Sequence, residues 1–129
     1  MMDRTEQALN TIREFSGQVI DISTCDLHEL MASKSPSRMI ELEADQPDRA
    51  AEMVSQVRAV LTDHNPGIRH AVMLVSEGLK HPCTIRENST LNRGFIEAVG
   101  SDAYLVKSFF EIDQSLESGL IVRLLLWTD

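Results

Sequence analysis

His81 and Cys83 stand two positions apart in the stretch Gly78–Ser89, which reads GLKHPCTIRENS. On an extended strand such residues share a face, so an imidazole there is able to act on a neighbouring thiol. A thiol becomes a useful nucleophile only where a base or a cation lowers its pKa, and Arg86 follows three positions later. Cys83 and His81 are therefore the candidate catalytic residues, although a cysteine that simply packs in the core is the commoner case.

Zinc binding is a second chemistry for the same stretch. The nucleobase-deaminase site needs a His-x-Glu motif and a Pro-Cys-x-x-Cys motif, and this chain has no His-x-Glu and no second cysteine three positions after Cys83. Cys25 and His28 together with His81 and Cys83 make a formal four-ligand set, but zinc ligands are usually spaced much more locally. The six glycines form no dinucleotide or P-loop motif. We expect no metal and no cofactor.

Three basic residues are candidate ligand-binding residues for a small anion. They are Arg86, Arg93 and Lys107, and a helix expected to begin near Ser89 would add its amino-terminal N–H groups. This interpretation requires the fold to bring all three cations to one surface.

Paired carboxylates occur twice on expected strands, where they are able to serve acid–base chemistry or to hold a cation. The pairs are Glu41 with Glu43 and Glu111 with Asp113, each two positions apart. The commoner interpretation is the hydrated side of a half-buried sheet.

Hydrophobic periodicity predicts the elements that must position these residues. An amino-terminal helix is expected at about 3–16, followed by one or two helical turns as far as Met31 and by a mobile loop at about 32–37. A long helix capped by Asp45, with Pro47 in its first turn, is expected to end near Leu61. Strands are expected at 38–44, 68–76, 83–87, 103–112 and 120–127, and a helix capped by Asn88 or Ser89 is expected to end before Gly100.

This order of elements predicts an α+β (mixed α/β) fold. Strand 38–44, the helix after it and strand 68–76 form a β-α-β unit, and the linker 113–119 predicts an antiparallel carboxyl-terminal hairpin. We expect one domain over residues 1–129, with a single sheet of about four to six strands and about two to three helices packed mainly on one face.

The last strand is apolar on both faces apart from Arg123. Such a strand lies either at the centre of a sheet or in a subunit interface. Because tryptophan is enriched at interface hot spots, Trp127 and Leu125 are the candidate interface residues.

Composition narrows the class of function. The net charge is −8, the basic residues are scattered, and no Lys/Arg cluster of the kind that binds nucleic acid is present. No apolar run is long enough for a membrane span, and the first residues do not form a signal peptide, so we expect a cytoplasmic protein.

No catalytic or cofactor motif is complete. We therefore expect a regulatory module without catalytic chemistry of its own, which binds a protein partner and self-associates as a homo-oligomer. An acidic face for a basic partner is one form that this binding could take. The alternative is a domain for an anionic small molecule, or a small enzyme, that uses the region from Cys83 to Arg93.

Overall fold

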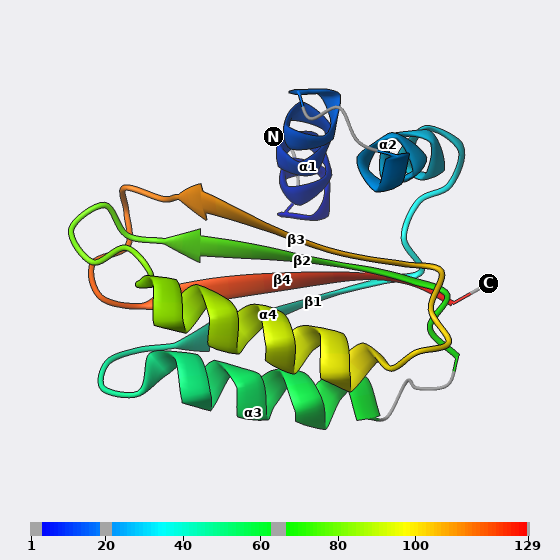
Figure 1. Cartoon of the computed structure of the whole chain (residues 1–129). Helices are drawn as coiled ribbons and strands as arrows, with labels where there is room; N and C mark the ends of the chain where they lie inside the picture. The colour runs from blue at the N-terminus through cyan, green and yellow to red at the C-terminus, as the bar shows by residue number, and fades with distance from the viewer. Residues whose placement is uncertain (1–3, 19–21, 63–66, 129) are drawn as a thin grey trace.

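The structure is a computed structural model that describes residues 4–18, 22–62 and 67–128. Within these ranges the chain forms four helices and four strands (Figure 1). No helix in the described ranges is long and apolar enough to span a membrane. In chain order the elements are α1 Arg4–Gln18, α2 Ile22–Ser33, β1 Arg38–Ala44, α3 Arg49–Thr62, β2 His70–Glu77, α4 Ile85–Val99, β3 Leu105–Ile112 and β4 Leu120–Trp127.

The four strands form one mixed sheet in the order β1-β4-β2-β3, which confirms the α+β class. β2 pairs in parallel with β3, and β4 pairs antiparallel with both β1 and β2. β1 and β2 are therefore parallel to each other, as the β-α-β interpretation requires, with β4 inserted between them. β3 and β4 run in opposite directions, with β2 between them.

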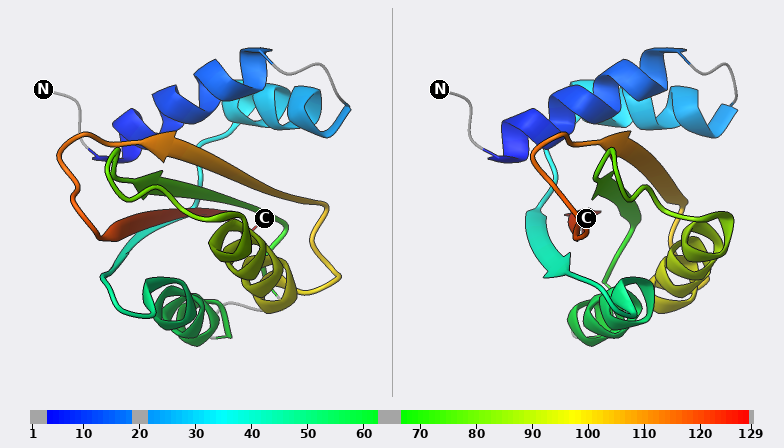
Figure 2. Two further views of the ribbon diagram at one scale, coloured as in Figure 1. Left: turned by 60° about the vertical axis from the view of Figure 1, so that its left-hand side comes forward. Right: turned by 90° about the vertical axis from the view of Figure 1, so that its left-hand side faces the viewer.

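Helices cover both faces of the sheet, so the expectation of two to three helices mainly on one face is wrong. α3 and α4 cover one face, and α1 and α2 cover the other (Figures 1 and 2). The physical reason lies in the two central strands, β2 and β4. Their side chains are apolar on both faces, and each face needs its own layer of helices to remove that surface from water.

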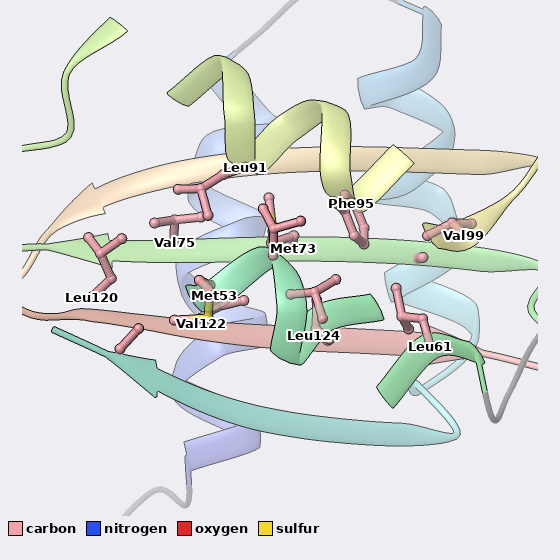
Figure 3. Packing of buried hydrophobic residues seen from close by; sticks show 14 of the residues in the cluster. Met53, Leu61, Met73, Val75, Leu91, Phe95, Val99, Leu120, Val122 and Leu124 are labelled. Carbon is pink, nitrogen blue, oxygen red and sulfur yellow. The ribbon is translucent and has the colours of Figure 1, made fainter. Parts of the chain in front are cut away.

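The larger of the two hydrophobic clusters lies between the sheet and the α3–α4 pair. Figure 3 shows side chains from α3, such as Met53 and Leu61, and from α4, such as Phe95, meeting those of β2 and β4. Helices α3 and α4 also touch each other closely at Gly94, where an added Cβ would lie 2.6 Å from Val54 Cγ1. Full burial of one such large apolar side chain stabilises the fold by roughly 1.5–3 kcal/mol.

Three local boundaries differ from the expectation. Residues 83–87 do not form a strand, because Thr84 caps α4 and the helix already begins at Ile85 rather than after Asn88 or Ser89. α3 begins at Arg49, after Asp48 adopts φ 60, so it starts later than the Asp45 cap and Pro47 suggested. The expected loop 32–37 is shorter, because α2 continues to Ser33.

Candidate functional site

Three connections gather at one edge of the sheet, at the left of Figure 1. They are segments 45–48, 78–84 and 113–119, which follow the carboxyl ends of β1, β2 and β3, and both α3 and α4 begin there. We call this side of the molecule the carboxyl edge. Open sheets with parallel strands usually bind ligands outside these strand ends, so it is the first place to seek a site.

Arg49 is the first residue of α3 and is buried, with 1% of its surface exposed. Its Nε and Nη2 donate hydrogen bonds to Oε2 and Oε1 of Glu87, at 2.8 and 2.9 Å. Its Nη1 donates to the carbonyl oxygen of Ser118 at 2.8 Å, and Nη2 also donates to the carbonyl oxygen of Pro82 at 3.2 Å. One guanidinium therefore fastens α3 to α4 and to the 78–84 and 113–119 connections.

Glu87 completes this arrangement from the first turn of α4. Its backbone N–H donates to Thr84 Oγ1 at 3.0 Å, and the Thr84 N–H donates to Glu87 Oε1 at 3.1 Å, which makes a capping box. The hydrogen bond from Arg49 is the largest of the effects that lower the pKa of Glu87, and the same bond raises the pKa of Arg49. The pair is therefore ionised at neutral pH.

Sequence reasoning missed Arg49, although a signal for it was present. Arg49, Met53, Val57 and Leu61 follow one another at intervals of four, so a charged residue stands at a position of the buried stripe of α3. An arginine at such a position needs a carboxylate partner in the fold, and here Glu87 is that partner.

Cys83 lies beside this network, and its environment favours the neutral thiol. Burial, and then a hydrogen bond with Glu77, raise the pKa of Cys83 to about 12. Cys83 is half-buried against the large hydrophobic cluster, whereas His81 is exposed. Because residues 81–84 form no strand, the shared face expected for His81 and Cys83 does not exist. The geometry does not favour a thiolate nucleophile.

The three candidate anion-binding cations do not meet on one surface. Arg86 and Arg93 are exposed on α4. Lys107 belongs to the other face of the sheet, because Leu105 and Phe109, which share its side of β3, pack in the cluster beneath α1 and α2. The fold thus separates Lys107 from the two arginines.

A hollow of about 510 Å³ opens at the carboxyl edge between the 113–119 connection and the end of β1. No lysine, arginine or histidine is among its lining residues. It is lined by the carboxylates of Glu43, Asp45, Glu52 and Glu117, by the apolar residues Ala44, Leu116, Leu120 and Ile121, and by Ser115, Ser118 and Gly119.

Asp45 is fixed in the wall of this hollow. Its Oδ1 accepts hydrogen bonds from Ser118 Oγ at 2.6 Å and from the Gln46 N–H at 2.7 Å. These bonds, that of Ser118 first, lower the pKa of Asp45, so the carboxylate stays ionised. Ser118 is itself held in place, because its carbonyl oxygen accepts a hydrogen bond from Arg49.

The paired carboxylates of the two strands have separate roles. Glu41 and Glu111 both lie near Arg123, with shortest N–O distances of 3.1 and 3.8 Å, and Ser76 Oγ donates to Glu111 at 2.7 Å. Glu43 instead lines the hollow. Asp113 accepts hydrogen bonds from the N–H and Oγ of Ser115, and these bonds lower its pKa. Neither pair presents two carboxylates to one ligand.

The remaining candidates lie elsewhere or outside the described residues. Within the described residues, no group of three or more His, Cys, Asp or Glu side chains is placed to hold a metal ion. The side chain of Cys25 is outside the described part of the chain, so the four-ligand zinc arrangement is not tested.

Trp127 and Leu125 are in the core beneath α1 and α2, with 1% and 0% of their surfaces exposed. The Trp127 Nε1–H donates to the carbonyl oxygen of Lys34 at 3.1 Å. Their strand, β4, is central in the sheet, which accounts for its two apolar faces without a second subunit. These two side chains therefore present no surface to a partner in this structure.

Comparison with known proteins gives neither a family nor a function. No protein-family model matches the chain, and no curated protein matches it in sequence. Among solved structures, CetZ1 from Haloferax volcanii in its GDP-bound monomeric form is similar over 84% of this chain and 34% of its own, at 13% identity and a TM-score of 0.42. HypE from E. coli is similar over 95% of this chain and 42% of its own, at 9% identity and a TM-score of 0.40. The chain thus spans less than half of either protein, and likeness at this level carries no argument.

Proposed function

We propose that the protein is a binding module without catalytic chemistry of its own, which takes up a basic segment of a partner protein in the acidic hollow of the carboxyl edge. The hollow is the single observation that carries this proposal. It combines four carboxylates with apolar wall residues and no basic residue, and its volume of about 510 Å³ is in the usual range of ligand sites.

The chemistry of the hollow suits the side chains of arginine and lysine. Glu43, Glu52 and Glu117 are exposed carboxylates that have no ion-pair partner within the described residues. A guanidinium or ammonium group would pair with them, while its aliphatic stem would lie on Leu116, Leu120 or Ile121. The overall charge of −8 would steer such a partner toward the molecule.

Two observations support binding over catalysis. The raised pKa of the Cys83 thiol disfavours this candidate nucleophile at neutral pH. The only guanidinium buried at the carboxyl edge among the described residues, that of Arg49, is occupied by Glu87 and by two carbonyl oxygens, and it serves to hold the walls in place.

Fluorescence anisotropy with a labelled peptide rich in arginine and leucine tests the proposal. We expect saturable binding that weakens with salt, and no binding of a matched peptide in which glutamate replaces arginine. The double substitution Glu52→Gln/Glu117→Gln should weaken binding roughly tenfold, because each exposed ion pair contributes up to about 1 kcal/mol.

A matched double variant controls for net charge. Glu97→Gln/Asp102→Asn also removes two exposed carboxylates but leaves the hollow intact, and it should bind like the parent protein. Equal loss of affinity in both double variants, or equal binding of the glutamate peptide, would contradict the proposal. Thermal stabilisation by small anions that disappears in Arg86→Ala would favour the anionic-ligand alternative instead.

A further inference from the structure

β3 is one of the two edge strands of the sheet, since β2 is its only neighbour in the strand order. It is eight residues long and contains no proline, and its residues from Val106 to Glu111 are only partly buried. Natural edge strands are usually short, interrupted or heavily charged, because an open edge readily pairs with another strand. β3 carries just two charged residues, Lys107 and Glu111.

These two charges are placed symmetrically about Phe109. If a second copy of β3 pairs antiparallel across a two-fold axis perpendicular to the sheet at Phe109, each Lys107 lies opposite Glu111 of the other copy. Opposite charges in directly facing positions stabilise a strand pair, and here the symmetry produces the interaction twice. Phe109 would face its own counterpart at the axis, where an aromatic pair also stabilises the sheet.

The other edge strand, β1, has no such complementarity. In a pairing of this symmetry, two residues that face each other must point to the same face of the sheet. In β1 the acidic residues Glu41 and Glu43 point to one face and Arg38 points to the other. No symmetric pairing of β1 with itself therefore places a positive charge opposite a negative one. A two-fold axis at Glu41 would place this residue opposite itself, and an axis at Leu42 would place Glu41 opposite Glu43. Both arrangements bring carboxylates face to face, which is destabilising.

The flank of α4 next to β3 gives a second, independent indication. Asn92 on this flank accepts a hydrogen bond from the Ser108 hydroxyl of β3 at 2.6 Å. This flank of α4 therefore faces β3. Ile85 and Ile96 lie on the same side of the helix as Asn92, and they are 89% and 49% exposed. Ile112, at the end of β3, is 48% exposed. Three of the five large hydrophobic side chains found exposed in the described residues thus border the β3 edge.

We propose that two copies of this chain associate through antiparallel pairing of β3 with β3, which joins their sheets and covers the isoleucines on the α4 flank. Lys107 and Phe109 also make contacts within their own chain, and Glu111 accepts a hydrogen bond from Ser76. The dimer adds contacts at the outer edge of β3, and the contacts within each chain remain in place. This surface is separate from the acidic hollow, so either proposal can fail without the other.

Charge reversal at the two symmetric positions provides the test by sedimentation velocity. The parent protein should sediment as a dimer of the 14.5 kDa chain. Lys107→Glu alone makes both members of each facing pair negative, and Glu111→Lys alone makes both members positive, so each variant should raise the dissociation constant at least tenfold. An equimolar mixture of the two variants should recover the dimer, because both facing pairs then carry opposite charges.

Recovery in the mixture also shows that both variants are folded. If Glu111→Lys fails to fold, Ile96→Asp tests the same interface, because this exposed side chain on the α4 flank is not needed for the core. It should dissociate the dimer, whereas Ala59→Asp, which adds the same charge at an exposed apolar position of α3, should not. A monomeric parent protein, single variants that stay dimeric, or a mixture of two folded variants that stays monomeric would each overturn the proposal. A dimer that resists all these changes would overturn it as well, because a different surface would then hold the two copies together.

Discussion

The buried pair of Arg49 and Glu87 makes the sharpest prediction about stability. Arg49→Met keeps most of the aliphatic volume of the side chain but removes all four hydrogen bonds of the guanidinium, two of them to a carboxylate. Breaking a buried ion pair by removing one partner costs about 3–5 kcal/mol. Because the Glu87 side chain is 20% exposed and retains its bond from Thr84, we expect the lower end, about 3 kcal/mol.

This loss can be converted into a shift of the melting temperature. The entropy of unfolding is about 2.1 cal/mol/K per residue, or about 0.27 kcal/mol/K for 129 residues, so the melting temperature should fall by about 11 °C. Urea unfolding followed by circular dichroism measures the free energy directly. Arg58→Met, on the same helix, breaks the exposed pair with Glu97, whose side chains are 57% and 56% exposed, and should cost less than about 1 kcal/mol.

The pH dependence gives a further signature of the same pair. The pKa of Glu87 is lowered in the folded state, so the stability contributed by the pair is complete above the ordinary value of 4.5 and is lost as the pH falls through the lower folded value. Arg49→Met should remove this part of the acid sensitivity. Equal effects of Arg49→Met and Arg58→Met, both below about 1 kcal/mol, would refute the role assigned to Arg49.

Three further predictions concern single side chains. Cys83 should react with iodoacetamide at pH 8 at least tenfold more slowly in the folded protein than in urea, since its pKa is raised to about 12 and the thiolate fraction falls accordingly. Equal rates would show that the thiol is not held as described. Gly94→Ala should destabilise the protein by about 1–3 kcal/mol in urea unfolding, because the added Cβ would lie 2.6 Å from Val54 Cγ1. A stabilised variant would mean that α3 and α4 separate freely. Trp127→Phe should cost roughly 2 kcal/mol through the lost hydrogen bond to the Lys34 carbonyl oxygen and the smaller core volume, and an unchanged unfolding midpoint would contradict this burial.

Strands were the part of the fold that local pattern predicted best. The bounds 38–44 and 120–127 are those of β1 and β4, and β2 and β3 begin only two residues later than expected. Alternating polar and apolar side chains, and short apolar runs, indicate a strand whichever strands become its neighbours in the sheet. The position of β4 between β1 and β2 depends on long-range pairing, which no local pattern encodes.

Two errors came from signals that were present but given too little weight. The alternation from Cys83 to Glu87 suggested a strand, yet Thr84 followed three residues later by Glu87 is a capping-box signature, and the helix it begins removed the strand. Apolar side chains on both faces of β2 and β4 already required helices on both sides of the sheet.

The candidate site was only partly accessible from the sequence. The carboxyl edge contains the stretch 78–84, in which the sequence placed the candidate catalytic residues, but Cys83 packs there as a neutral thiol. The hollow is built from carboxylates in separate segments, including Glu43, Glu52 and Glu117, which only the fold brings together. Arg49, which holds the walls, stands at a position of the buried stripe of α3, but the sequence does not identify its partner Glu87, which is 38 positions away.

The most direct test of the proposed function is to locate bound peptide on the protein. Amide ¹H–¹⁵N spectra recorded during a titration with the arginine- and leucine-rich peptide should shift first at Glu43, Asp45, Glu52 and the segment 115–121, which line the hollow. Residues at the opposite edge, such as Arg69 and Tyr104, should stay unchanged. Shifts confined to that opposite edge, or to the outer side of β3, would contradict the assignment of the acidic hollow as the binding site.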